Sequence, residues 1–524
     1  MNLATIKYVN MGNKNITRIC LIGIPLFWNC LSCTKLDTKV YDQVTNFWQT
    51  PDQVAAGVAP AYSGLRNYAP ANEVYSLNEV STDEIIVPIR GGDWNDNGIW
   101  EKLWKHTWGP DHTFVSVVWD FIYTGIARVN SILQTVDAIA PRPGDFASIQ
   151  AELKTIRAFY YFLALDLYGN VPIVEDNEAD LSKLGNKSRA EVFSFVEKEI
   201  KDNLSALTPE TTPASYGRAT QWLAQSLLAK LYLNAGIYTG TTRWSECIAA
   251  CDAILNSNKY SLEANFFNNF SIANESSQEN IFVIPFDWNA GLNYFWLQPA
   301  TLHYNSNATF GLAAGGYNGL CSTAEYYNLF DARDARRKMF LVGQQYVNQI
   351  MDSAHMQYDT DVNLPLNFDP VITKFSNPAP ESRMSGARCA KWEFNKESDG
   401  PMSNDFAVFR LADVLLMKAE AQFRNGDIAA ALVTINQKIN GVSIRSRAGL
   451  PDFSAAEMTP DGLLIERARE LSWEGWRRND MIRLGHFTDP RIPEKGVSGN
   501  FRALYPIPKS ALDKNPYLVQ NQGY

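Results

Sequence analysis

The 524-residue sequence has little histidine, and none of it falls in a recognised metal-binding spacing. Its five histidines form no HExxH pattern. The sequence also lacks a Walker A loop, a dinucleotide-binding glycine fingerprint and a GxSxG nucleophile elbow. These absences argue against several large enzyme classes. A glycosidase needs only two carboxylates, so the missing motifs do not exclude one.

Cysteine is scarce as well. The seven cysteines are too few and too scattered for a disulfide framework in so long a chain. Three of them lie near the N-terminus. Cys247 and Cys251 are four residues apart in a stretch that predicts a helix. Two small core residues are the favoured interpretation of that pair, and a bridge or metal pair is the alternative.

Basic charge is in short supply. The sequence holds 47 Lys and Arg against 56 Asp and Glu, which gives a net charge of −9. An acidic chain repels phosphate backbones, so no nucleic-acid partner is expected. Hydrophobic residues make up 46% of the chain and charged residues 20%, which is ordinary globular usage and enough for a large core. The 14 Trp and 23 Tyr supply flat rings that can fill a core or form an exposed stacking surface.

No apolar run is long enough to span a bilayer permanently. The N-terminal segment 1–18 is polar with three positive charges, and the apolar run 19–31 follows it, interrupted by Pro25 and Asn29. This order is typical of a signal peptide. Met11 is an alternative start that would give a leader of more usual length.

The leader ends in Leu31-Ser32-Cys33 and a polar stretch. A small residue before a cysteine resembles a lipoprotein signal, in which Cys33 is diacylated and becomes the new N-terminus; two acyl chains hold a domain stably at a membrane. The position three before Cys33 is usually aliphatic and is Cys30 here. We therefore predict a signal peptide over 1–32 with lipidation at Cys33, and a plain secretory signal is the alternative.

Helical patterns dominate the rest of the chain. Segment 151–169 is apolar nearly all round, which predicts a buried helix. Segments 219–236 and 244–257 form one predicted helix pair, and 412–427 and 428–440 form another. Alanine-rich helices joined by glycine or asparagine turns resemble tetratricopeptide repeats, although the irregular spacing excludes a regular tandem array.

Two irregular segments interrupt the helices. Residues 281–285 predict a buried strand, and a long loop-like stretch rich in Asn, Gly, Trp and Tyr continues to 320. Residues 87–98 contain Gly91, Gly92 and Gly98, which disfavour regular structure. Long irregular segments inside a compact domain are usually functional, so we expect the binding residues here.

Stretches spread over nearly the whole chain carry a family resemblance. They are SCTKLDT at 32–38, STDEIIVPIRGGDWNDNGIW at 81–100, IRAFYYFLALDLYGNVPIV at 156–174, FRLADVLLMKAEAQFRNGD at 409–427, ERARELSWEGWRRNDMIRLG at 466–485 and YPIPKSALDKNPYLVQNQGY at 505–524. In this order they resemble the SusD/RagB family of Bacteroidetes outer-membrane lipoproteins. The unusual residue three before Cys33 is the one departure.

The resemblance implies a mostly α-helical fold. Tetratricopeptide-like helix pairs would form a scaffold on one side, with long loops and a few short β-strands on the other. It divides the mature chain into parts 33–280 and 281–524, which form one compact unit.

The resemblance also implies a function. The protein would be a lipid-anchored, cell-surface glycan-binding lipoprotein of the outer membrane. It would deliver oligo- or polysaccharide to a SusC-like TonB-dependent transporter without cleaving it. No cofactor is expected and no metal ligand is predicted, and a structural metal that braces the loops stays open. A surface glycoside hydrolase, a helical-repeat protein-binding scaffold and a peptide-uptake component remain alternatives.

Glycan binding needs exposed aromatic planes for the sugar faces and polar side chains for the hydroxyl rims. Trp94 is the first candidate, because it lies in a Gly-flanked polar loop and the matching loop of the family carries a binding aromatic. The alternative is that Trp94 pins the loop to the core. The full set of predicted ligand residues is Arg90, Asp93, Trp94, Asn97, Trp288, Tyr294, Trp296 and Tyr317.

Other prominent residues favour structural roles. Trp100, Trp104 and Trp108 are spaced by four and predict a core stripe on one helical face. Glu470 and Glu474 could be read as an acid–base pair. Neighbouring arginines would lower the pKa values of both carboxylates, which does not suit a general acid, so a salt-bridge network is the favoured reading. Adjacent Asp83 and Glu84 should point apart and serve as polar anchors.

Overall fold

The structure is a computed structural model that describes residues 50–524, apart from 69–72, 140–143 and 293–294. The chain from Trp48 onward clusters into one compact unit. The predicted signal peptide and Cys33 lie outside the described residues. The predicted boundary between residues 280 and 281 stays a prediction.

Helices dominate the unit, which confirms the predicted fold class. Those before residue 240 are α1 (Pro51–Ser63), α2 (Glu73–Glu79), α3 (Ile99–Trp104), α4 (Thr113–Asp137), α5 (Phe146–Leu167), α6 (Arg189–Asn203), α7 (Gln221–Leu233) and α8 (Ala235–Thr239). Those after it are α9 (Trp244–Ser257), α10 (Leu297–Thr301), α11 (Ser306–Phe310), α12 (Ala324–Tyr327), α13 (Leu411–Arg424), α14 (Ile428–Ile435), α15 (Ile444–Arg447), α16 (Pro460–Leu471), α17 (Arg477–Leu484) and α18 (Lys509–Lys514).

The predicted helix pairs are present. Helix α9 has the predicted bounds and packs on α7, while α13 packs on both α14 and α9. Helix α14 ends at Ile435, five residues earlier than predicted, because the backbone turns at Asn436. Cys247 and Cys251 are buried free thiols on α9, which confirms that they are core residues.

Strands are short and paired in twos in the part of the chain that the structure describes. The longest pairing joins β2 (Asn280–Ile284) antiparallel to β10 (Phe406–Arg410), and both strands are buried throughout, which confirms the strand predicted at 281–285. The others pair β1 (Ile89–Arg90) with β8 (Ser376–Asn377), β3 (Phe340–Leu341) with β9 (Arg388–Cys389), β4 (Gly343–Gln344) with β7 (Asn367–Phe368), and β5 (Tyr358–Asp359) with β6 (Leu364–Pro365).

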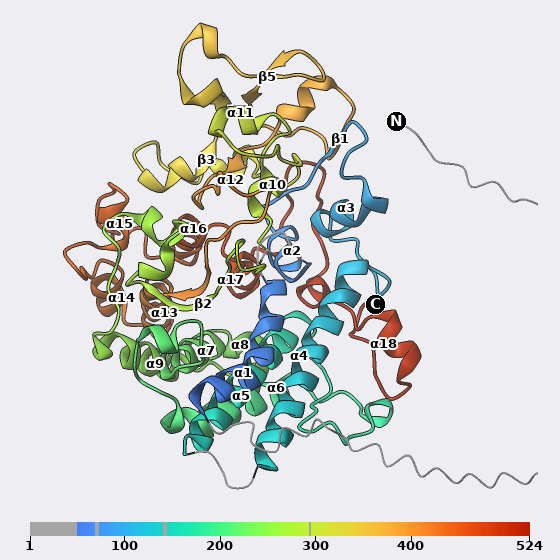
Figure 1. Ribbon diagram of the computed structural model, residues 1–524, viewed down its shortest axis with the longest axis vertical. Coiled ribbons are helices and arrows are strands. Elements are labelled where there is room, and N and C mark those ends of the chain that lie inside the picture. The colour runs from blue at the N-terminus through green and yellow to red at the C-terminus, as the bar shows by residue number, and fades with distance from the viewer. Residues whose placement is uncertain (1–49, 69–72, 140–143, 293–294) are drawn as a thin grey trace, which may run out of the picture. The chain divides into compact units, whose positions relative to one another are not determined.

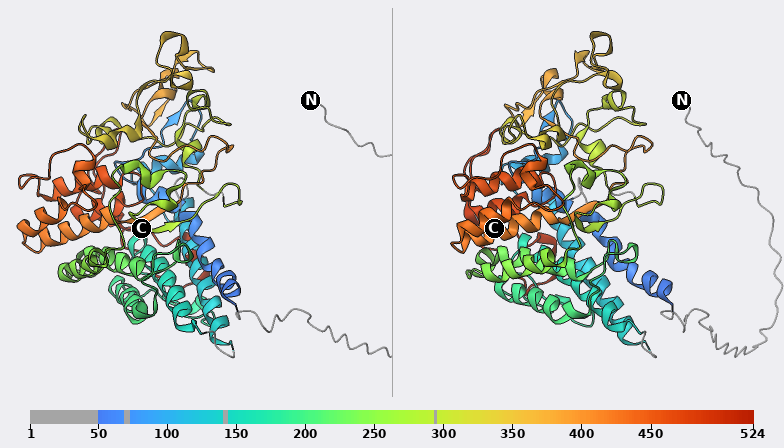
Figure 2. Two further views of the ribbon diagram at one scale, coloured as in Figure 1. Left: turned by 60° about the vertical axis from the view of Figure 1, so that its left-hand side comes forward. Right: turned by 90° about the vertical axis from the view of Figure 1, so that its left-hand side faces the viewer.

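The elements separate into two regions. Figures 1 and 2 show α4 to α9 gathered at one end of the unit, and β1, β5 and α11 with their long connections at the other. The segment 286–320, predicted as a continuous loop, contains the short helices α10 and α11. The helical scaffold therefore carries a separate region of loops.

The tryptophan stripe is part of the core. Trp100, Trp104 and Trp108 are 6%, 1% and 1% exposed, which confirms their predicted burial. Helix α3 ends at Trp104, so Trp108 reaches the core from the turn beyond it. The C-terminal tail packs on the core at Tyr505, which is fully buried and whose hydroxyl donates to the Leu77 carbonyl at 2.7 Å.

A buried ion network joins β10 to the C-terminal helices. The guanidinium of Arg410, at the end of β10, donates to Glu474 at 2.7 and 2.8 Å, to Glu279 at 2.5 Å and to Glu470 at 3.1 Å. Arg447 and Arg336 also bind Glu470, at 2.6 and 3.0 Å. Burial alone would raise the pKa of Glu470, but these three arginines hold it below its usual value. The network is structural, as predicted, and does not suit acid–base chemistry.

The pKa of a second buried acid, Glu84, is shifted in the opposite direction, upward. Glu84 accepts the backbone N–H of Trp473, while its neighbour Asp83 points to Arg477 instead, so the two anchor different groups as predicted. Burial raises the pKa of Glu84 to about 7. Burial, and then the charge of Glu84, also raise the pKa of Glu79.

The raised pKa of Glu84 predicts that the stability of the protein depends on pH. A raised folded-state pKa gives stability that is present below the unfolded pKa of ~4.3 and lost as pH rises through about 7. Glu84→Gln keeps an oxygen for the Trp473 N–H and carries no charge. Between pH 5 and 8 the variant should therefore lose less unfolding free energy than the wild type, by on the order of 2 kcal/mol. Urea denaturation at both pH values measures the difference, and equal losses in the two proteins would contradict the assignment.

Candidate functional site

The loop between β1 and α3 holds Trp94 in an unusual backbone conformation. Trp94 has φ +62°, and Asp96 and Asn97 are also left-handed, at +40° and +55°. A bulky residue rarely adopts this conformation, and such strain persists only where the surroundings enforce it. One constraint is the bond from the Trp100 indole N–H to the Asp96 carboxylate at 2.7 Å.

The Trp94 ring is half-buried and fixed on several sides. Its Nε1–H donates to the Tyr317 carbonyl at 2.7 Å, and its ring meets Trp100 edge-on with centroids 5.6 Å apart. A Cβ atom on Gly319 would lie only 2.4 Å from Trp94 Cζ2, so the indole packs directly on that glycine. The indole is therefore anchored, and it keeps an exposed portion; ligand contact by Trp94 stays a prediction.

Tyr304 lies next to the same loop, although the sequence did not single it out. Its hydroxyl donates to the exposed Asp93 carboxylate, and the Arg383 guanidinium carbon lies 4.8 Å from its ring centroid. Burial, then the bond to Asp93, raise the pKa of Tyr304 to about 12, so its hydroxyl keeps its proton at physiological pH. Arg383 is held by Asp361 at 2.7 Å and also binds Asp359.

Tyr317 is brought to this place by two glycines. A Cβ atom on Gly315 or Gly316 would lie 2.1 or 1.9 Å from the carbonyl oxygens of Tyr304 and Leu302. Only glycine allows the two backbone segments to approach so closely. The Tyr317 side chain is 47% exposed, and its backbone carbonyl receives the Trp94 indole N–H.

These contacts bring Trp94, Tyr304 and Tyr317 close together, and we call the three residues the aromatic platform. Trp94 lies more than 200 residues before Tyr304 and Tyr317, which are close to each other in the chain. Asp93 and Arg383 lie beside it and offer a hydrogen-bond acceptor and donors. Flat rings bordered by polar groups suit a ligand with apolar faces and hydroxyl edges.

Arg90 departs from the prediction. It is 2% exposed, and its guanidinium donates to the carbonyls of Asn318, Gly319 and Ser385 at 2.6 to 3.0 Å. A side chain occupied in this way cannot reach a ligand, so the predicted contact is wrong. Arg90 instead joins the start of the Trp94 loop to the backbone of Asn318 and Gly319, which follow Tyr317.

The remaining predicted ligand residues differ in how exposed they are. Asn97 is exposed in the Trp94 loop. Trp288 and Trp296 are half-buried; the Trp288 backbone N–H donates to Ser403 Oγ at 3.1 Å, and the Trp296 ring lies against Gly400. Tyr294 lies outside the described residues. Ligand contact by these residues stays a prediction.

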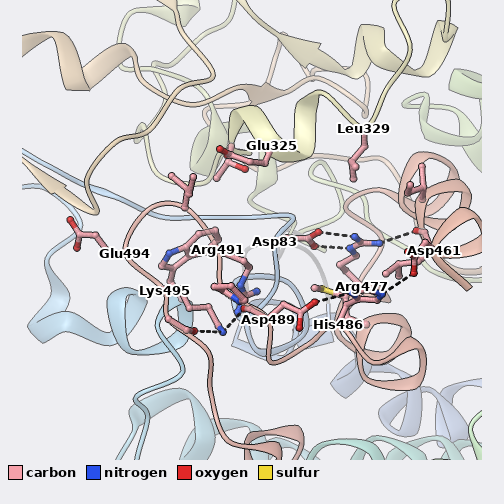
Figure 3. Close-up of a pocket in the computed structure, with 18 residues that line it drawn as sticks. Asp83, Glu325, Leu329, Asp461, Arg477, His486, Asp489, Arg491, Glu494 and Lys495 are labelled. Carbon is pink, nitrogen blue, oxygen red and sulfur yellow. Dashed lines mark hydrogen bonds and ion pairs between the residues drawn. The ribbon is translucent and has the colours of Figure 1, made fainter.

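The cavity that Figure 3 shows lies elsewhere, beside α12, α16 and α17. It measures about 890 Å³, but several of its charged groups are paired with one another. Asp83 binds Arg477 through both oxygens at 2.7 Å, and His486 bridges Asp461 and Asp489 at 3.0 and 2.8 Å. Arg477 lowers the pKa of Asp83 despite its burial, which does not suit a general acid. The aromatic platform is therefore the better candidate for ligand binding.

The described residues contain no group of three or more His, Cys, Asp or Glu side chains placed to hold a metal ion. No helix among them is long and apolar enough to cross a membrane.

Comparison with known families decides the classification. The sequence model described as "SusD family" matches residues 256–524, and one described as "Starch-binding associating with outer membrane" matches residues 36–233. The chain belongs to the SusD family. This agrees with the resemblance found in the sequence.

Individual relatives of this SusD-family protein cover most of its length. The starch-binding protein SusD of Bacteroides thetaiotaomicron is 26% identical over 500 residues, covering 86% of this chain and 85% of that protein. SusD-like protein P38 of Formosa agariphila is 23% identical, covering 98% and 99%.

Solved structures share the fold. Surface glycan-binding protein A from Bacteroides thetaiotaomicron, in complex with laminarihexaose, has a TM-score of 0.71 and 20% identity, covering 90% of this chain and all of that chain. A laminarin-binding SusD-like protein has a TM-score of 0.72 and 21% identity, covering 91% and 100%.

Proposed function

We propose that this SusD-family protein binds glycans at the bacterial surface and passes them, chemically unaltered, to a TonB-dependent outer-membrane transporter. The aromatic platform carries the proposal. Trp94 and Tyr317 keep exposed ring area, and Asp93 and Arg383 supply polar contacts at the edge. Relatives described as starch-binding and laminarin-binding support the ligand class.

Binding without cleavage is the second part of the proposal. The carboxylates that attracted attention in the sequence, Glu470 and Glu474, are buried with arginines and are closed to substrate. Purified protein incubated with a panel of starch, laminarin and other polysaccharides should retain at least one of them on affinity gels. No new reducing ends should appear. Release of reducing ends that stops when one carboxylate is replaced would favour a hydrolase instead.

Surface attachment is the third part, and it depends on Cys33. Two acyl chains on that thiol would hold the protein at the outer membrane. Cys33→Ala should therefore move the protein from the membrane fraction to the soluble fraction and abolish metabolic labelling with a fatty acid. Cys30→Ala is the matched control and should leave both unchanged. Labelling that persists in Cys33→Ala would place the anchor at another residue.

A further inference from the structure

A second cavity lies beside α7 and β2, and none of its lining residues belongs to the aromatic platform. It measures about 350 Å³, near the lower end of the ~300–1,000 Å³ typical of ligand sites. Its walls are the loop 210–217, Thr220 at the start of α7, and the segment from Lys259 to β2. Figure 1 shows β2 beside α7, whereas β1 and α11, which flank the platform, lie toward the other end.

Asn280 lines the cavity and has a buried side-chain acceptor without a partner. This residue is only 8% exposed, and its Oδ1 atom has no hydrogen-bond partner in the described part of the chain. Its Nδ2 atom makes only a long bond of 3.5 Å to the Asn269 carbonyl. A buried amide oxygen without a partner is costly, and a ligand hydroxyl would relieve that cost.

Tyr260 supplies a second underused group. The side chain is half-buried, and burial alone raises the pKa of its hydroxyl, without a contribution from any neighbouring charge or hydrogen bond. Tyr216 on the opposite loop differs, because its hydroxyl donates to Asp405 at 2.5 Å. Tyr216 therefore offers a fixed ring, and Tyr260 offers a ring with an available hydroxyl.

The charges of the cavity favour a neutral ligand. Lys259 and Glu210 form an ion pair at 3.1 Å, which leaves Glu275 as the one carboxylate of the lining without a cation opposite it in the described residues. Thr220, Ser277 and Gln278 add hydroxyl and amide groups. Two tyrosine rings, one orphaned amide oxygen and several neutral polar groups fit a small polyhydroxylated molecule.

We infer that this cavity is a second carbohydrate site, which binds one end of a short neutral oligosaccharide independently of the aromatic platform. The ligand class rests on the proposed function, but the site uses none of the platform residues. A chain with two separate sites could hold a polysaccharide at two points, which would raise its apparent affinity.

The test uses the mature protein with the Trp94→Ala change, which removes most binding at the platform. Maltose and laminaribiose are the probes, and ligand-detected NMR and calorimetry measure the remaining binding. We expect weak saturable binding to persist. Adding Tyr260→Phe, which deletes only the hydroxyl, should reduce it about fivefold. Adding Asn280→Leu should reduce it similarly. Tyr517→Phe, at an exposed tyrosine remote from both sites, is the control and should change nothing.

The outcomes separate this inference from the proposed function. No residual binding of either disaccharide to Trp94→Ala, or residual binding that Tyr260→Phe leaves unchanged, would overturn the second site. If Trp94→Ala binds polysaccharide as the wild type does, the platform assignment fails, and the effect of Tyr260→Phe on total binding still decides the cavity. Should Asn280→Leu fail to fold in a thermal melt, Tyr260→Phe alone gives the answer.

Discussion

Arg410→Met is expected to lower the unfolding free energy by ~3–5 kcal/mol, the usual cost of removing one partner from a buried ion pair. The methionine has a similar volume but cannot compensate the carboxylates of Glu279, Glu470 and Glu474. All three are buried, so each would lose a nearby positive charge in a place that water does not reach. Denaturation in guanidinium chloride at neutral pH measures the change.

Acid sensitivity gives a second readout for the same variant. Burial raises the pKa of Glu279, but Arg447 and Arg410 outweigh that effect and lower it to about 2. A lowered folded-state pKa gives stability that is present above the unfolded pKa of ~4.3 and lost as pH falls through about 2. Without Arg410, the folded-state pKa of Glu279 should rise toward its unfolded value, so this contribution should be smaller and the loss should be complete at a higher pH.

The control for Arg410→Met is an ion pair of the same type on the surface. Lys198 and Asp202 form an exposed i,i+4 pair on α6, so Lys198→Met should change stability little. Equal effects of the two substitutions would contradict the structural role of the buried network. Adding Glu470→Gln to Arg410→Met should recover part of the lost stability, because it removes one uncompensated charge.

Trp94→Ala is expected to weaken glycan binding by ~1–3 kcal/mol, or about 5–150-fold, as for other aromatic residues that dominate a binding surface. The fold should persist, because the indole is half-exposed and no buried charge depends on it. Calorimetry with whichever polysaccharide the affinity panel identifies, together with a thermal melt, measures both properties. Unchanged affinity in a folded variant would remove Trp94 from the site.

Two further variants test whether glycan affinity depends on the presence of the Trp94 ring or on its exact position. Trp94→Phe keeps a flat ring but loses the bond to the Tyr317 carbonyl, so it should bind with intermediate affinity. Gly319→Ala changes no group of the platform, but its new methyl would lie 2.4 Å from Trp94 Cζ2 and displace the indole. If position matters, Gly319→Ala should weaken binding nearly as much as Trp94→Ala.

The scaffold was largely predictable from the sequence, because helix periodicity is a local signal. Helix α9 matches the predicted 244–257, and the all-round apolar pattern of 151–169 correctly predicted the buried helix α5. The two short helices inside 286–320 were missed. Each is only five residues long, too short for a periodic pattern to be distinguished from a loop.

The candidate site was only partly predictable, because it is assembled from distant segments. Trp94 and Tyr317 could be proposed from local composition alone. Tyr304 and Arg383 could not, since their roles arise only when 302–304 packs against Gly315 and Gly316. Arg90 lies next to the Trp94 loop, but the sequence does not reveal that its guanidinium donates to backbone carbonyls instead of facing a ligand.

The close packing of Trp94 on Gly319 affects how the protein would distinguish among ligands. A ring held in place before the ligand arrives needs little rearrangement on binding, so most of the entropy loss falls on the sugar chain. Glycans whose preferred curvature already matches the platform should then bind more tightly than flexible chains of the same composition. Selectivity would depend on the three-dimensional form of the polymer as much as on the identity of its monomers.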